Sequence, residues 1–227
     1  MTAPRGVFFD FGGTLVESFA DPFPAYREVL KAHGIALERN SFDAAWRTLP
    51  KETAADARAY LGRTDDYWRR WDARALAALK VRDPKGRITR DLRDAFVDPR
   101  WHQPFPESQT VLEELRDEGF TLHLISNHTE DLLRILERLD WRDLFASVSF
   151  SQEVGVEKPD PELFELALRR AKLERARTVH VGDTWETDVV GARRVGLRPV
   201  WLNRQGAPVR AEVPAIADLY GVRALLE

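Results

Sequence analysis

The polar residues that could do chemistry in this sequence stand at the ends of apolar segments. Asp10 lies near the end of the apolar segment 6–11, and two glycines and a threonine follow it. The segment 120–126 ends at a serine and is followed by an asparagine, and the segment 178–181 leads into a glycine and an aspartate. With one loop lysine and a further aspartate, the candidate residues are Asp10, Gly12, Gly13, Thr14, Ser126, Asn127, Lys158, Gly182, Asp183 and Asp188.

These residue types suit the transfer of a phosphoryl group. Carboxylates that converge without a cation would repel one another, whereas Mg²⁺ is commonly bound by a few carboxylates together with waters and substrate oxygens. A hydroxyl, the backbone amides of a glycine-rich turn and one lysine could hold a phosphoryl group and offset its developing charge. A carboxylate can then act as the nucleophile, which divides hydrolysis into two easier steps.

The second part of the chain predicts the sheet that would bring these residues together. Strand patterns alternate with helix patterns, the strands at 120–126, 147–151, 178–181 and 199–202 and the helices at 107–117, 129–139, 161–171 and 186–195. Such alternation predicts a parallel sheet with helices on both faces. The predicted fold class is therefore α/β, with a Rossmann-like, doubly wound parallel sheet that binds ligands beyond the carboxyl ends of its strands.

The region between the first strand and the rest of the sheet contains no convincing strand. Its apolar residues recur at helical spacing, as Trp68, Trp71 and Ala75 do, and prolines and glycines punctuate it. This pattern predicts an all-helical module inserted after the first strand. We therefore expect an α/β core domain of residues 1–17 and 104–227 and a helical cap domain of residues 18–103.

The composition excludes several functional classes. The net charge of −3 and the interleaving of arginines with acidic residues give no field that would attract nucleic acid or an anionic membrane. Cysteine is absent, which excludes a thiol nucleophile and a thiolate metal site. The first five residues show no signal region, and no stretch approaches the roughly 18 apolar residues of a membrane span. We expect a cytoplasmic protein whose partner is a small molecule, and the sequence leaves its oligomeric state open.

The four polar segments resemble, in order, the four motifs of the haloacid dehalogenase superfamily. They read Asp10-Phe11-Gly12-Gly13-Thr14-Leu15, Ser126-Asn127, Lys158-Pro159-Asp160-Pro161 and Gly182-Asp183-Thr184 with Asp188 beyond. The resemblance covers the whole predicted core. The predicted helical module stands where subfamily I of that superfamily carries its C1-type cap.

The resemblance implies a Mg²⁺-dependent phosphatase that acts on a small phosphomonoester through an aspartyl-phosphate. It implies that Asp10 is the nucleophile, and that Lys158 and Ser126 join it in catalysis. The implied phosphate-binding residues are Thr14, Ser126, Asn127 and Lys158. The implied Mg²⁺ ligands are Asp10, the backbone carbonyl of Gly12, Asp183 and Asp188.

The sequence departs from the pattern of such phosphatases at Gly12. They usually carry a second aspartate at this position, which protonates the leaving alcohol and later deprotonates the attacking water. A general acid of this kind typically contributes about 10²–10⁴-fold to the rate, so its absence should slow the hydrolysis of poor leaving groups. The metal contact implied for Gly12 needs only a carbonyl oxygen and survives the change.

Three functions remain open on this basis. In the first, the chain is a phosphatase that uses a good leaving group or an acid from elsewhere, such as His128, Glu17 or a cap residue. In the second, it binds phosphorylated ligands with little or no turnover. In the third, it is a 2-haloacid dehalogenase. The dehalogenase hypothesis is the weakest, because Asp183 keeps a metal carboxylate that a Mg²⁺-free dehalogenase would not need. Those enzymes also tend to carry a tyrosine at the Gly12 position. The sequence favours the phosphatase.

Overall fold

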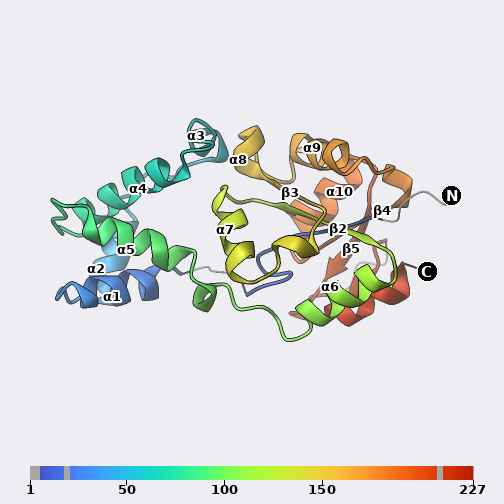
Figure 1. The fold of residues 1–227 in the computed structure, drawn as a ribbon, viewed down its shortest axis with the longest axis horizontal. Coiled ribbons are helices and arrows are strands. Elements are labelled where there is room, and N and C mark those ends of the chain that lie inside the picture. The colour runs from blue at the N-terminus through green and yellow to red at the C-terminus, as the bar shows by residue number, and fades with distance from the viewer. Residues whose placement is uncertain (1–5, 18–20, 209–211, 227) are drawn as a thin grey trace.

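The protein is built around a central six-stranded parallel sheet (Figure 1). The computed structural model describes residues 6–17, 21–208 and 212–226. The predictions for residues 1–5 and for a cap boundary at residue 18 fall outside these ranges. The strands are β1 (Gly6–Phe9), β2 (Thr121–Ser126), β3 (Ser147–Phe150), β4 (Thr178–Gly182), β5 (Arg198–Leu202) and β6 (Ala215–Ile216), in the spatial order β3-β2-β1-β4-β5-β6. The α/β fold class is confirmed, and only the two-residue β6 was not predicted.

The sheet is buried because successive residues of its central strand face opposite layers. In β1, Val7 and Phe9 pack into one hydrophobic cluster and Phe8 packs into another, as the twofold repeat of a strand requires. The first cluster takes apolar side chains from α6 (Ser108–Asp117), α7 (Asp131–Arg138) and η5 (Leu219–Leu225). The second takes them from α9 (Pro161–Ala171) and α10 (Gly191–Arg194). Helices therefore cover both faces of the sheet.

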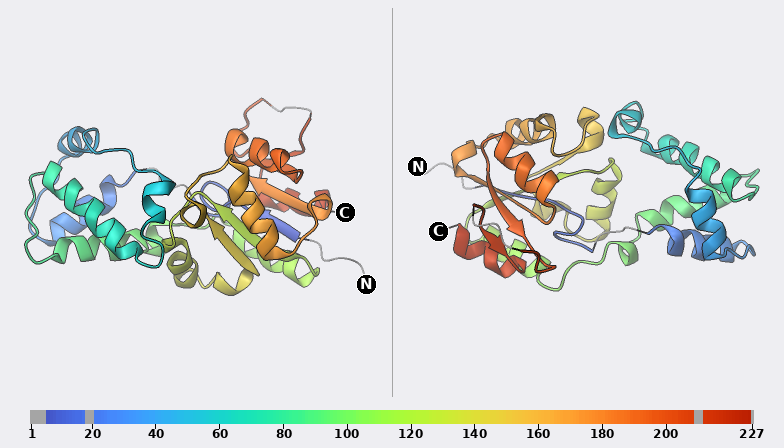
Figure 2. Two further views of the ribbon diagram at one scale, coloured as in Figure 1. Left: turned by 90° about the horizontal axis from the view of Figure 1, so that it is seen from above. Right: turned by 180° about the vertical axis from the view of Figure 1, so that it is seen from behind.

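The described residues between β1 and Pro104 form helices, as predicted. The α-helices are α1 (Phe23–Ala32), α2 (Arg39–Trp46), α3 (Ala54–Arg58), α4 (Thr64–Ala78) and α5 (Arg87–Phe96). Helices α1, α2, α4 and α5 share a hydrophobic cluster of their own that includes Tyr26, Phe42 and Leu92. Figure 2 shows these helices as a separate body beside the sheet. We propose that they are the cap domain expected for residues 18–103.

The chain leaves the sheet layer and returns to it at neighbouring points. Val16 forms an antiparallel bridge with Pro104, and the backbone N–H of Glu17 donates to the carbonyl of Gln103 at 2.8 Å. The two connections to the helical body thus run side by side. A two-stranded connection of this kind is the arrangement expected for a domain inserted into another.

One predicted helix differs in the structure. The segment 186–195 is not a single α-helix but a π-helical turn, η4 (Trp185–Val190), followed by α10. Here the buried Asp188 side chain bonds to groups of the sheet and of a neighbouring loop, and such wide turns often occur at functional sites. Among the described residues, no helix has the length and apolar character needed to span a bilayer.

Candidate active site

The candidate site lies where the carboxyl ends of β1 and β4 meet. The chain order of the strands reverses on either side of β1, and a crevice opens at such a point in doubly wound sheets. Asp10 follows β1 directly, and its backbone N–H donates to the carbonyl of Val181 in β4 at 2.9 Å. Asp183 follows β4 directly. Residues 173 positions apart in the sequence are therefore held at one edge of the sheet.

Three carboxylates gather at this edge. One oxygen from each of Asp10, Asp183 and Asp188 lies within 4.8 Å of the others. Asp10 and Asp188 are buried, and Asp183 is partly exposed. The sequence-based prediction that these three residues converge is confirmed by the geometry.

Two glycines make room for the carboxylates. A Cβ atom on Gly13 would lie 2.5 Å from Oδ2 of Asp183, and Gly13 has a φ of +81°, which favours glycine. A Cβ atom on Gly182 would lie 2.2 Å from Cγ of Asp188. Any side chain at either position would displace a carboxylate, so both glycines serve the site as well as the backbone.

A buried lysine binds two of the carboxylates. Nζ of Lys158 donates to Oδ1 of Asp10 and to Oδ1 of Asp188, each at 2.6 Å, and its side chain is 2% exposed. Burial alone would lower the pKa of Lys158, but the two carboxylates outweigh it and raise the pKa above its ordinary value. Lys158 is therefore a fixed positive charge beside Asp10.

The carboxylates differ in their electrostatic surroundings. Burial raises the pKa of Asp10 to about 6, although Lys158 opposes the rise. Burial and the nearby Asp188 also raise the pKa of Asp183. Burial acts in the same sense on Asp188, but Lys158 and His180 outweigh it and hold its pKa well below the usual range. Lys158 thus offsets burial only in part at Asp10, no lysine or arginine of the described residues pairs with Asp183, and Asp188 has both Lys158 and His180.

Asp188 has protein donors around both of its oxygens. Its Oδ1 accepts hydrogen bonds from Lys158 and, at 3.0 Å, from Nε2 of His180. Its Oδ2 accepts from the backbone N–H of Thr184 at 3.1 Å. Asp10 has the Lys158 bond on Oδ1, and Asp183 has only the long contact between its Oδ1 and the Thr14 hydroxyl, at 3.4 Å. Among the described residues, Oδ2 of Asp10 and Oδ2 of Asp183 are therefore the carboxylate oxygens of this cluster left for a ligand.

The residues of the second motif lie beside the carboxylates. Ser126 ends β2, is 4% exposed and lines the cavity described below. Oδ1 of Asn127 accepts from the backbone N–H of Lys158 at 2.7 Å, and its Nδ2 donates to the carbonyl of Lys158 at 3.2 Å. Asn127 therefore positions the loop that carries Lys158. The sequence predicted that Asn127 contacts phosphate and did not predict this structural role.

Thr14 does not lie where the phosphate-binding role expected from the sequence would require. Its side chain is fully buried, and its hydroxyl accepts from the backbone N–H of Asp183 at 3.1 Å and lies 3.4 Å from Oδ1 of the same residue. Thr14 does not line the cavity. In this geometry its hydroxyl positions Asp183, and a direct contact with phosphate is not supported.

Two residues that support the site were not singled out from the sequence. His180 lies inside β4 and bonds to Asp188, and Nε1 of Trp201 donates to the carbonyl of Asp183 at 2.9 Å. The available signal for His180 was its polar side chain in the apolar segment 178–182. Trp201 carried no such signal, because a tryptophan in a buried strand is ordinary.

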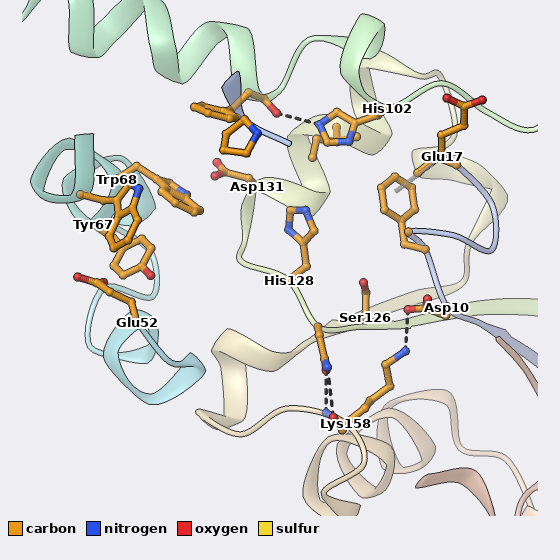
Figure 3. A pocket seen from close by; sticks show the side chains of 18 of the residues that line it. Asp10, Glu17, Glu52, Tyr67, Trp68, His102, Ser126, His128, Asp131 and Lys158 are labelled. Atoms are coloured by element: carbon orange, nitrogen blue, oxygen red, sulfur yellow. Dashed lines mark hydrogen bonds and ion pairs between the residues drawn. The ribbon is translucent and has the colours of Figure 1, made fainter. Parts of the chain in front are cut away.

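A cavity of about 710 Å³ opens from the edge of the sheet that carries the carboxylates toward the helical body. Asp10, Ser126 and Lys158 lie at one end of it, and Tyr67, Trp68 and Glu52 of the helical body lie at the other (Figure 3). Trp46, Trp71 and Phe96 also line it from the helical side. The cavity therefore has a charged end on the sheet and a largely aromatic wall on the cap.

The two bodies are joined next to this cavity by a buried ion pair. Nη2 of Arg93 in α5 lies 2.6 Å from Oδ2 of Asp131 in α7, and both side chains are at most 7% exposed. Gln152, which is fully buried, also donates to the carbonyl of Ala57 in α3 at 2.8 Å. These contacts fix the cap over the carboxyl ends of the strands.

The residues present fit a divalent cation. The carboxylates of Asp10, Asp183 and Asp188 face one another, and among the described residues the Lys158 ammonium is the one lysine or arginine group that bonds to them. Burial is the main cause of the raised pKa values of Asp10 and Asp183, and the neighbouring carboxylates add to it. Oxygen ligands are the ones that Mg²⁺ prefers, and an ion here would offset the repulsion.

The sequence model of the haloacid dehalogenase-like hydrolase family matches residues 4–196 of this chain. Haloacid dehalogenase-like hydrolase domain-containing protein 3 from Homo sapiens is 30% identical over 181 residues, which is 76% of this chain and 71% of that protein. Phosphoserine phosphatase from Thermus thermophilus is 40% identical over 119 residues, which is 51% of this chain and 47% of that protein. The chain therefore spans about half the length of this relative.

The structure resembles solved members of the same family along its whole length. The 2-haloacid dehalogenase from Pseudomonas syringae superposes with a TM-score of 0.71 at 28% identity and covers 98% of each chain. The putative hydrolase YfnB from Bacillus subtilis, solved with magnesium, gives a TM-score of 0.68 at 19% identity and covers 99% of each chain.

Proposed function

This chain belongs to the haloacid dehalogenase-like hydrolases, and we propose that within this family it is a Mg²⁺-dependent phosphatase of small phosphomonoesters. The observation that carries the proposal is the pairing of Asp10 with Lys158 beside two further carboxylates. The buried ammonium offsets charge next to an aspartate with an open oxygen, which is what a carboxylate nucleophile facing an anionic substrate needs.

The residues divide the work of the reaction between them. Oδ2 of Asp10 attacks phosphorus, and an aspartyl-phosphate forms as the bond to the leaving oxygen breaks. Lys158 and the Ser126 hydroxyl hold the phosphoryl oxygens at the charged end of the cavity. Water then cleaves the aspartyl-phosphate and returns the carboxylate. Asp10, Asp183, the carbonyl of Gly12 and Asp188 would hold Mg²⁺, which supplies positive charge to the phosphoryl group.

The cap supplies the other half of the proposed site. Its aromatic wall offers apolar contact to the organic part of a substrate, and its position over the strand ends excludes bulk water from the charged end. Relatives named phosphoserine phosphatase and glyceraldehyde 3-phosphate phosphatase support a small phosphorylated substrate. We therefore propose a small phosphomonoester as the substrate class of this chain.

One observation favours the dehalogenase as a second candidate. Gly12 carries no acid, a halide leaving group needs none, and a 2-haloacid dehalogenase is among the similar structures. The carboxylate cluster argues against it, because Asp183 and Asp188 would have no cation to hold.

Phosphate and halide release from the same preparation separate the two functions. We expect Mg²⁺-dependent phosphate release from 4-nitrophenyl phosphate, its loss with a chelator, and no turnover by Asp10→Asn. Halide release from 2-chloropropionate that persists in chelator would favour the dehalogenase. Phosphate release by a folded Asp10→Asn variant would contradict the assignment of the nucleophile.

A further inference from the structure

The proposed phosphatase has no acid at residue 12, so the leaving group needs a proton from another source. Glycine at this position has no ionisable side chain, and an alkoxide is a poor leaving group without protonation. The donor must reach the far side of the phosphoryl group, because Asp10 attacks in line with the departing oxygen. The proton donor must therefore be an ionisable group that lines the cavity beyond Ser126.

Two ionisable groups in the cavity are engaged by other parts of the protein. The Asp131 carboxylate lies in the buried ion pair with Arg93, at 2.6 Å. Nε2 of His102 lies 2.8 Å from the carbonyl oxygen of Phe96, and in Figure 3 the His102 ring lies farther from Ser126 and Asp10 than the His128 ring does. Neither group is poised to exchange a proton with a ligand.

Two glutamates are also poorly placed. Oε1 of Glu52 accepts hydrogen bonds from Arg70 at 2.8 Å and Arg74 at 2.7 Å, and Glu52 lies at the cap end of the cavity (Figure 3). Glu52 is thus bound by two guanidinium groups, at the opposite end of the cavity from Asp10. The exposed Glu17 carboxylate points away from Asp10 in Figure 3.

Among the carboxylic acids and histidines that line the cavity beyond Ser126, His128 remains, and its orientation suits proton transfer. Figure 3 places its ring between Ser126 and Asp131, on the cavity side of Ser126. Its Nδ1 lies 2.9 Å from the carbonyl oxygen of Thr129. A carbonyl only accepts, so Nδ1 carries a hydrogen in both charge states, and Nε2 is the atom that gains and loses the proton.

The backbone around His128 is held firmly. The carbonyl of His128 accepts hydrogen bonds from the hydroxyl of Ser151 and from the backbone N–H of Gln152, each at 3.2 Å. The ring meets the edge of Phe11, with centroids 6.4 Å apart and planes at 86°. A fixed ring can present Nε2 to the same place in each turnover.

We propose that His128 is the catalytic acid and base of this enzyme, in place of the side chain that Gly12 lacks. This inference rests on the proposed phosphatase function. In the first step, Asp10 bonds to phosphorus, the phosphorus–oxygen bond to the alcohol breaks, and the Nε2 proton of the imidazolium passes to the departing oxygen. In the second step, neutral Nε2 takes a proton from water as the water oxygen bonds to phosphorus. The Asp10 carboxylate leaves, and the products are phosphate and the imidazolium.

The surroundings of His128 set the direction of its pH dependence. Burial lowers the pKa of His128 below 6.5, the Thr129 carbonyl and the Asp131 carboxylate raise it, and Arg93 lowers it. His102 is the other ionisable ring close enough to interact. The imidazolium is present only at low pH, so turnover of alkyl phosphates should fall as pH rises through this lowered pKa.

The test compares leaving groups that differ in their need for a proton. We would measure kcat/KM for 4-nitrophenyl phosphate and for benzyl phosphate with Mg²⁺, in the wild type, His128→Gln and the control His102→Gln. We expect His128→Gln to lose about 10²–10⁴-fold on benzyl phosphate and less than about tenfold on 4-nitrophenyl phosphate. The control should change both substrates by the same factor.

A double variant tests the chemistry by rescue. Gly12 is not among the glycines with positive φ, so its backbone accepts a side chain. Adding Gly12→Asp to His128→Gln should restore turnover of benzyl phosphate. If His128→Gln does not fold, the wild-type pH profiles decide, since only benzyl phosphate should lose kcat/KM as pH rises through the His128 pKa.

The results that overturn the inference are distinct from those that overturn the phosphatase. Equal losses on both substrates, or no loss on either, would exclude His128 as the proton donor, as would identical pH profiles. Absence of Mg²⁺-dependent phosphate release from both esters by the wild type would instead contradict the proposed function itself.

Discussion

Asp10→Asn should make the metal-free protein more stable at neutral and alkaline pH, although it removes the nucleophile. The pKa of Asp10 is about 6 in the folded protein, against 3.8 for an ordinary aspartate. A raised folded pKa contributes stability that is fully present below 3.8 and lost as pH rises through 6. The ionised Asp10 therefore costs folding free energy above pH 6, and an isosteric amide avoids that cost.

The size of the effect follows from the shift. A difference of about two pKa units corresponds to about 3 kcal/mol at pH 8, and the same linkage gives about half of that near pH 5. Urea unfolding in chelator at both pH values would measure it. The free energy of unfolding of Asp10→Asn should exceed that of the wild type by up to about 3 kcal/mol at pH 8, with a smaller excess at pH 5.

Asp188→Asn is the matched control, because it removes the same charge from the same cluster. Lys158, His180 and the Thr184 N–H stabilise the ionised form of Asp188 and lower its pKa. Its loss should therefore destabilise the protein at pH 8, by about 3–5 kcal/mol if it behaves as a broken buried pair. The reasoning is refuted if Asp10→Asn is less stable than the wild type at pH 8, or if both variants shift stability in the same direction.

Further predictions concern the space around the carboxylates, the cap contact and the metal. Gly13→Ala should displace Asp183 and so raise the Mg²⁺ concentration for half-maximal activity about 10- to 100-fold. The control Gly62→Ala has a similar φ of +75° but no atom within 4 Å of its Cβ, and it should leave that concentration unchanged. Equal effects of the two variants in a metal titration would rule out the steric explanation. Arg93→Met should lower the free energy of unfolding by about 3–5 kcal/mol, because the buried Asp131 would keep only its 3.6 Å contact with Arg134. Arg100→Met, in an exposed pair, should lower it far less. Similar losses in urea titrations of the two variants would contradict this ranking. Without chelator, Mg²⁺ at 100 times its Kd for the wild type should stabilise the wild type by about 2.7 kcal/mol. The same Mg²⁺ concentration should stabilise Asp10→Asn by clearly less. An equal gain in the melting temperature of the two proteins would mean that the ion binds elsewhere.

The architecture and the convergence of the site could be predicted from the sequence because both follow from short-range patterns. Alternating strand and helix periods predict a parallel sheet, and the carboxyl ends of parallel strands share one edge. Asp10 and Asp183 follow strands directly and Ser126 ends one, so their convergence could be predicted from the strand order alone. The helical insertion was equally visible, since a period of 3.6 persists from Tyr26 to Phe96.

The detailed roles could not be predicted, because they depend on which atoms meet. Nothing in the sequence distinguishes a Thr14 hydroxyl that faces a phosphate from one that bonds to Asp183. The pairing of Asn127 with the backbone of Lys158 likewise joins residues 31 positions apart. The π-helical turn at Trp185–Val190 lies in a segment with an ordinary helical pattern, and the two-residue β6 is too short to show a period.

The central claim is that Asp10 is the nucleophile of a phosphoryl transfer, and trapping the covalent enzyme tests it most directly. The wild type would be mixed with 4-nitrophenyl phosphate and Mg²⁺, quenched in acid within one turnover, digested and examined by mass spectrometry. We predict a phosphoryl group on the peptide that carries Asp10, absent when Mg²⁺ is omitted. Rapid product formation with an unmodified Asp10 peptide, or a phosphoryl group on any other residue, would contradict the account.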